Sequence, residues 1–208
     1  MSIALVLEIE ELVFDTVTMR TDALQLALTL EGYPLPHDVV RRAHAGATAV
    51  MALDALAVSA SMDVVARDLV LARTAAAMRA ILERGTPCFS TVARDRVAHL
   101  SSEYPLAVVT RADRHDAQRM LEQADLDVCI RTIRSLGDLP ESAQHDVWAE
   151  TRSRLFADRC IAIARRPLLA AARRAGYATV AIDETSAETD ATLVSLAELD
   201  ASFLLTVS

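Results

Sequence analysis

Charged and hydroxyl side chains gather at the ends of three short apolar runs in this sequence. Glu8 and Glu10 end one run, Thr110 and Arg111 end a second, and Arg165 ends a third. A guanidinium beside a poorly solvated carboxylate forms a charge-assisted ion pair, so we expect one of the two arginines to pair with one of the two glutamates. Two alternatives stay open. The acidic residues form a solvated loop, or Thr110 and the two arginines bind a phosphorylated metabolite without turning it over.

The absence of lysine removes several kinds of chemistry. All 21 basic residues are arginines, so no titratable amine is available for a Schiff base, a Walker-type phosphate contact or a lysine general base. The five histidines show no zinc-binding spacing, and neither a nucleophile elbow, a P-loop nor a dinucleotide fingerprint occurs. These patterns exclude zinc hydrolases, serine hydrolases and nucleotide-dependent enzymes, and we expect no cofactor.

The composition predicts a folded protein in the cytoplasm. The chain has 208 residues, of which 52% are hydrophobic and 24% charged, which suits one domain or one core with an insertion. The net charge of −8 repels phosphate backbones, so we expect no nucleic-acid partner. We expect no membrane partner either, because no apolar run reaches the ~20 residues of a membrane helix and the N-terminus lacks the basic segment of a signal peptide. The three cysteines form no C-x-x-C pair and are expected to be reduced.

Short apolar segments alternate with helical patterns in the second half of the chain. Such segments predict strands buried on both faces of a parallel sheet. Strands are predicted at 3–9, 106–110, 160–164 and 179–182, with a weaker one at 128–133. Helices are predicted at 113–125, 141–155 and 167–175, the first capped by Asp113 and the last stopped by Gly176. This alternation predicts right-handed βαβ units and a doubly wound α/β fold with a parallel sheet.

The segment between the first two strands has a different pattern. Helices alone are predicted at 21–31, 38–45, 47–56 and 62–83, which indicates an all-helical cap inserted after the first strand. We place the α/β core at 1–16 and 87–208 and the helical cap at 17–86. Near the C-terminus, 195–199 is predicted as helix and 203–207 as an edge strand.

Ligands of open α/β sheets bind beyond the carboxyl ends of the strands. The residues at and just after those ends therefore define the candidate site, which comprises Glu8, Glu10, Glu11, Thr110, Arg111, 134–138, Ala164, Arg165, Asp183 and Glu184.

Segments at this edge resemble the motifs of the haloacid dehalogenase (HAD) superfamily, in its β-phosphoglucomutase and phosphoglycolate phosphatase-like group. The segment LVLEIEELVFDT (5–16) is similar to the first motif, a strand ending in D-x-D-G-x-L-x-D-T. Residues 104–126 resemble the second motif, a strand ending in Ser or Thr before a helix, and residues 160–177 resemble the fourth, a strand before an Ala-rich helix. The similarity covers essentially the whole chain and implies a Rossmann-like core with a helical cap.

The resemblance assigns a role to each motif position. In the family the first aspartate attacks a phosphoryl group, the second acts as general acid and base, a lysine or arginine balances charge, and fourth-motif acids hold Mg²⁺. Glu8 and Glu10 stand at the two aspartate positions, and Gly137 stands at the third-motif lysine position. Ala164 and Arg165 replace the acidic pair.

These replacements disfavour catalysis. A glutamate reaches about an ångström further than an aspartate, and a misplacement of that size lowers a rate roughly 10²-fold. Alanine offers no oxygen ligand, and a guanidinium repels Mg²⁺. We therefore expect a pseudoenzyme without catalytic residues or a metal site, in which Glu8 and Glu10 are degenerate equivalents of the aspartates. Its remnant anion site is Thr110, Arg111 and Arg165. Its expected partner is another protein or a second copy of the chain, with a small phosphorylated metabolite as a further ligand.

The alternative is a divergent Mg²⁺-dependent phosphatase or phosphomutase that acts on a small phosphorylated metabolite. In that interpretation Glu8 attacks despite its length, Arg131 or Arg134 takes the place of the lysine, and one further acidic residue recruits the metal. The candidates for that acidic residue are Asp15, Asp138 and Asp183.

Overall fold

The computed structural model describes residues 2–10, 12–44, 49–84, 89–137, 139, 141–182 and 189–207. The chain forms two compact units, one made of Met1–Phe14 and Phe89–Ser208 and the other of Asp15–Cys88. The cap predicted from the sequence, 17–86, falls inside the second unit. None of the helices in the described ranges combines the length and apolar character needed to cross a bilayer.

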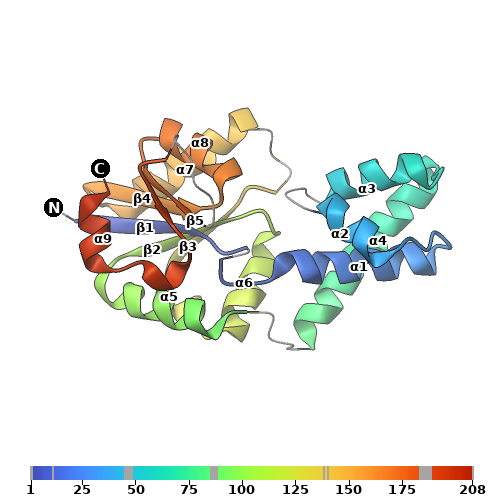
Figure 1. The fold of residues 1–208 in the computed structure, drawn as a ribbon, viewed down its shortest axis with the longest axis horizontal. Coiled ribbons are helices and arrows are strands. Elements are labelled where there is room, and N and C mark those ends of the chain that lie inside the picture. Colours follow the sequence, from blue (N-terminus) through green and yellow to red (C-terminus); the bar gives the residue numbers. More distant parts are fainter. Residues whose placement is uncertain are drawn as a thin grey trace. The chain divides into compact units, whose positions relative to one another are not determined.

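The first unit is built on a parallel sheet (Figure 1). Its strands are β1 (Ile3–Glu8), β2 (Leu106–Thr110), β3 (Ile130–Ser135), β4 (Arg159–Ala164), β5 (Ala178–Ile182) and β6 (Ala191–Leu193). They lie in the order β3-β2-β1-β4-β5-β6, and each neighbouring pair is parallel. Strands β1, β2 and β4 are buried over nearly their whole length, as expected where helices cover both faces of a sheet. The structure confirms the predicted doubly wound α/β fold.

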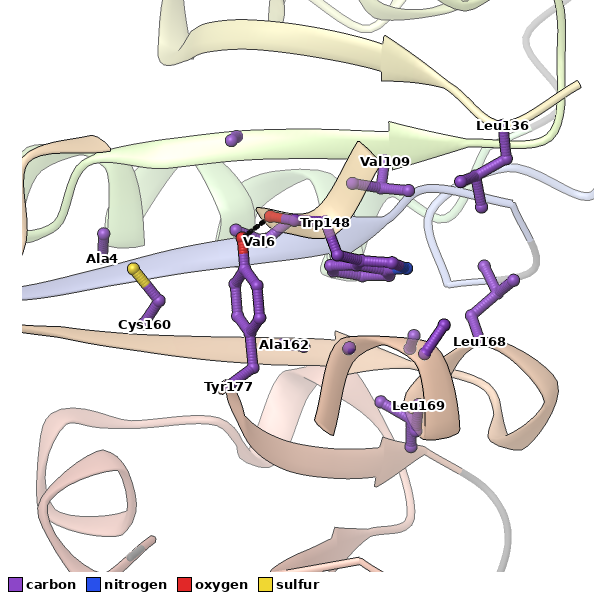
Figure 2. Packing of buried hydrophobic residues seen from close by; sticks show 14 of the residues in the cluster. Ala4, Val6, Val109, Leu136, Trp148, Cys160, Ala162, Leu168, Leu169 and Tyr177 are labelled. Carbon is purple, nitrogen blue, oxygen red and sulfur yellow. Dashed lines mark hydrogen bonds between the residues drawn. The ribbon is translucent and has the colours of Figure 1, made fainter. Parts of the chain in front are cut away.

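Helices cover both faces of this sheet (Figure 1). The helices are α5 (Thr91–Glu103), α6 (Arg114–Gln123), α7 (Glu141–Leu155) and α8 (Arg166–Arg174). Helices α7 and α8 lie on one face, where the fully buried Trp148 of α7 packs edge-on against Tyr177 with ring centroids 5.3 Å apart. The Tyr177 hydroxyl donates a hydrogen bond of 2.9 Å to the backbone oxygen of Trp148 (Figure 2). Aromatic area and a satisfied hydroxyl together fix this layer of the core.

Several elements differ from the sequence prediction. The strand predicted at 203–207 is wrong, because the chain there forms helix α9 (Ala201–Thr206), whose cap residue Asp200 accepts a hydrogen bond from the Phe203 N–H at 2.7 Å. A short apolar run fits either a strand or a helix, and the cap selects the helix. The weaker strand predicted at 128–133 starts later, after the 3₁₀ turn η1 (Asp127–Cys129). Helix α5 and strand β6 were absent from the prediction, although Ser90 caps α5.

The described residues of the second unit form helices and their connections. They are α1 (Thr16–Leu30), α2 (His37–His44), α3 (Ala49–Ser59) and α4 (Val64–Glu83). Their apolar faces meet in a separate core that includes Leu24, Leu28, Val40, Leu53 and Val70. The unit therefore has its own hydrophobic centre.

The chain leaves the first unit and returns to it at neighbouring positions. The backbone N–H of Ser90 donates to the carbonyl oxygen of Val13 at 2.8 Å. Phe14 and Phe89 pack edge-on with ring centroids 6.1 Å apart. The 3₁₀ turn η2 (Leu196–Glu198) completes the described elements.

Candidate functional site

The candidate site lies at the carboxyl edge of the sheet, where β1 ends between β2 and β4. The chain runs from β1 outward to β2 and β3 on one side, and then crosses past β1 to β4, β5 and β6 on the other. Such a change of direction leaves a crevice outside the strand ends, which is where ligands of open α/β sheets bind. Glu8 is the last residue of β1, so its carboxylate starts from this position.

Glu8 is buried and both of its carboxylate oxygens have partners. One oxygen, Oε1, lies 3.2 Å from Nη2 of the Arg111 guanidinium. The other, Oε2, accepts a hydrogen bond of 2.9 Å from the backbone N–H of Arg165. Arg165 is the N-cap residue of α8, a helix without a side-chain cap. Glu8 therefore supplies the negative charge that a helix N-terminus favours.

Glu10 is equally buried but has different partners. Its Oε1 accepts three hydrogen bonds, from the Thr110 hydroxyl at 2.5 Å, the Arg111 N–H at 2.7 Å and the Ala112 N–H at 2.9 Å. The three donors belong to one loop, residues 110–112, which connects β2 to the Asp113 cap of α6. Glu10 thus joins the end of β1 to this loop.

The neighbouring strand holds the 110–112 loop in position. The hydroxyl of Ser135 donates to the Ala112 carbonyl oxygen at 2.7 Å, and the Leu136 N–H donates to the Thr110 carbonyl oxygen at 2.7 Å. Both partners come from the end of β3, so the loop is fixed from both flanking strands. The loop carbonyl oxygens of Thr110 and Ala112 are thus held from this side, while the N–H groups of Arg111 and Ala112 donate to Glu10.

Burial and the neighbouring Glu10 change the acidity of Glu8. Burial, and then the charge of Glu10, raise the pKa of Glu8 from its ordinary value of 4.5 to about 7, against the opposing effect of Arg111 and Arg165. Loss of water disfavours the ionised form, and a like charge adds to that effect. Glu8 therefore titrates near neutral pH.

The structure brings together the candidate residues from three strand ends. Glu8, Glu10, Thr110 and Arg111 form one connected set, and Arg165 joins it through its backbone N–H. The expected pairing of an arginine with a glutamate is confirmed for Arg111 and Glu8.

Other candidates lie elsewhere or outside the described part of the chain. Arg134 does not take the place of the absent lysine, because it forms an ion pair with Glu150 of α7. Arg131 is exposed on β3. Asp15 caps α1 by accepting the Thr18 N–H at 3.1 Å. Glu11, Asp138, Asp183 and Glu184 lie outside the described residues.

The contribution of Ala112 was missed by the sequence reasoning. Its part in the site is a backbone N–H, which every residue except proline carries. No pattern of residue types marks such a donor, although its place two residues after the strand-ending Thr110 was a usable signal.

Comparison with known proteins gives this arrangement its context. No protein-family model matches the sequence, and no curated protein gives a match. Solved structures match over nearly the whole chain. A haloacid dehalogenase-like family hydrolase from Streptococcus pneumoniae has a TM-score of 0.75 and 20% sequence identity, covering 96% of this chain and 97% of that one. The chain has the haloacid dehalogenase-like fold.

Two further structures show the range of proteins with this HAD-like fold. A β-phosphoglucomutase from Clostridium difficile matches with a TM-score of 0.75 at 12% identity, covering 99% of this chain and 96% of that chain. A predicted phosphoglycolate phosphatase from Haemophilus somnus matches with a TM-score of 0.76 at 14% identity, covering 94% and 95%. At these identities the likeness concerns the fold.

The described residues at the edge of this HAD-like fold do not fit the Mg²⁺ ion that the sequence resemblance implies. Mg²⁺ requires oxygen ligands in near-octahedral arrangement. Both oxygens of Glu8 already accept from nitrogen donors, and the end of β4 contributes the methyl group of Ala164 and the cation of Arg165. Within the described ranges no cluster of three or more His, Cys, Asp or Glu side chains has metal-binding geometry.

Proposed function

We propose that this chain is a non-catalytic protein with a HAD-like fold, which acts by binding another protein. The observation that carries the proposal is the state of Glu8, whose two oxygens are bound by the Arg111 guanidinium and the Arg165 N–H. A carboxylate nucleophile needs an oxygen that faces the substrate. These two contacts hold Glu8 in place at the strand end, which favours a structural part for its carboxylate.

The second glutamate supports the same conclusion. A general acid and base must reach the leaving group of the substrate, whereas the Oε1 atom of Glu10 accepts three hydrogen bonds from the 110–112 loop. Burial moreover favours the protonated form of Glu8, because it raises the pKa of this carboxyl to about 7. A protonated carboxyl is a poor nucleophile.

A panel of phosphate esters assayed with and without Mg²⁺ tests the proposal. We expect no turnover above that of the Glu8→Gln variant, which keeps the side-chain length and removes the charge. For each of the two proteins, adding Mg²⁺ should leave the melting temperature unchanged, because a metal that binds only the folded state would raise it. Turnover that needs Mg²⁺ and disappears in Glu8→Gln would establish the divergent phosphatase or phosphomutase instead.

The partner that we propose is a protein, with a second copy of this chain as the first to test. An alternative ligand is a small phosphorylated metabolite bound at Thr110, Arg111 and Arg165. This alternative is disfavoured because the Thr110 hydroxyl and the Arg111 N–H already donate to the Glu10 carboxylate. Sedimentation at several concentrations tests self-association. A single monomeric species would direct the search to other proteins of the cytoplasm, the compartment that we propose on the basis of the free thiols of Cys129 and Cys160.

A further inference from the structure

The 110–112 loop has the donor arrangement of an anion-binding site. Three donors converge on one oxygen atom: the Thr110 hydroxyl, the Arg111 N–H and the Ala112 N–H lie 2.5, 2.7 and 2.9 Å from Glu10 Oε1. Successive backbone N–H groups that point to one position form a concave nest for an anion. The loop also leads into the N-terminus of α6, which carries a positive partial charge.

The anion in this nest belongs to the chain itself. Glu10 is only 2% exposed, so its carboxylate fills the position at which the donors converge. A solute anion could reach these donors only by displacing Glu10. Displacement is unfavourable because the expelled side chain would lose the three hydrogen bonds that it accepts from the loop.

The surrounding charges favour an anion at this position. Arg111 lies against Glu8, and the charge of Arg165 also acts on Glu8. With Glu10 in place, two guanidiniums and two carboxylates lie at this strand edge. Without it, the two guanidiniums would face the single carboxylate of Glu8.

We propose that Glu10 is an internal plug of an oxyanion site, and that removing its carboxylate opens the 110–112 loop to inorganic phosphate. A tetrahedral oxyanion offers several acceptor oxygens to the converging donors. This inference rests on the proposed function and deepens it, since it names the class of ligand that the natural chain excludes.

Thermal melting in phosphate tests the plug. The Glu10→Ala variant lacks the carboxyl end, whereas the matched control Glu10→Gln keeps an oxygen that can accept from the same donors. With ~10 mM phosphate and a Kd of about 1 mM, we expect the melting temperature of Glu10→Ala to rise by about 3–6 °C relative to sodium chloride of equal ionic strength. Wild type and Glu10→Gln should shift by less than ~1 °C under the same conditions.

A second substitution locates the bound ion. Adding Thr110→Val to Glu10→Ala removes the hydroxyl donor at nearly constant volume, and it should reduce the phosphate-dependent shift by at least half. If Glu10→Ala is unfolded in chloride, refolding in phosphate, followed by the fluorescence of the buried Trp148, gives the same comparison.

The outcomes separate the plug from the proposed function. The plug would be overturned if phosphate raised the melting temperature of wild type as much as that of Glu10→Ala. It would also be overturned if phosphate neither shifted the melting temperature of Glu10→Ala nor assisted its refolding. Neither outcome would bear on the proposed lack of catalytic activity. Turnover of phosphate esters by wild type that requires Glu8 would overturn the proposed function, whatever Glu10→Ala binds.

Discussion

Two glutamates separated by one residue have unlike surroundings. Glu8 faces a guanidinium and the N-terminus of α8, whereas Glu10 accepts from a hydroxyl and two backbone N–H groups. Both are buried, and burial is the largest cause of the raised pKa of Glu8. The position of each carboxylate at the sheet edge, not its residue type, decides how it behaves.

The raised pKa of Glu8 has a consequence for stability. An acid whose pKa is higher in the folded state than in the unfolded state stabilises the fold fully below pH 4.5, and this stabilisation is lost as the pH rises toward 7. We expect the free energy of unfolding of wild type, relative to Glu8→Gln, to fall by about 3 kcal/mol across this interval. Denaturant titrations of both proteins at a series of pH values measure this difference. Parallel pH profiles would show that Glu8 does not titrate in this interval.

The sequence was enough to predict which residues meet at the site, but not which contacts they make. Parallel strands end at one edge, so residues after β1, β2 and β4 had to lie close to one another. Which arginine pairs with Glu8 depends on side-chain paths over the strand ends, and a residue pattern does not specify those paths. The three bonds to Glu10 were also out of reach, because two of their donors are backbone N–H groups.

At the scale of elements, the β2–α6 connection carries the candidate site. Thr110 ends the strand, Arg111 and Ala112 present their N–H groups, and Asp113 begins the helix by accepting the His115 N–H at 2.8 Å. The cap and the nest are therefore consecutive parts of one turn. Weakening the cap should loosen the nest.

The Asp113→Ala variant tests this coupling. Loss of an N-cap carboxylate lowers the free energy of unfolding by about 1 kcal/mol, and Asp200→Ala, which removes the comparable cap of α9, is a matched control. We expect similar losses of stability in denaturant titrations. In the Glu10→Ala background, only Asp113→Ala should also weaken phosphate binding. Equal phosphate binding in both double variants would show that the cap and the nest are independent.

Element prediction succeeded where periodicity and length agreed. The strands at 106–110 and 179–182 are short, continuously apolar and bounded by helical patterns, and helix 141–155 matches its predicted bounds. Residues 203–207 gave no such agreement, because an apolar run this short fits a strand and a helix equally well. There the decision came from a single capping carboxylate, Asp200.

On the scale of the whole molecule, each of the two units has its own core. Leu53 and Val70 belong to the core of the helical unit, and Trp148, the single tryptophan of the sequence, belongs to the core of the α/β unit. Tryptophan fluorescence therefore reports on the α/β unit alone. Far-ultraviolet circular dichroism reports on both.

A substitution in one core tests whether the units unfold separately. Leu53→Ala removes a fully buried side chain and should lower the stability of the helical unit by about 2–5 kcal/mol. We expect an earlier transition in circular dichroism and an unchanged transition in Trp148 fluorescence. A fluorescence midpoint that falls together with the circular dichroism midpoint would show that the two units unfold as one cooperative unit.

The hydrogen bond between Ser90 and Val13 bears on how such a protein can evolve. Because the chain departs and returns at adjacent points of the sheet unit, the whole intervening segment resembles a module joined by a narrow stem. Exchange, lengthening or shortening of that module leaves the strand ends, and the glutamates on them, in place. Lineages could thus acquire new recognition surfaces by replacing the inserted module while inheriting the sheet unchanged.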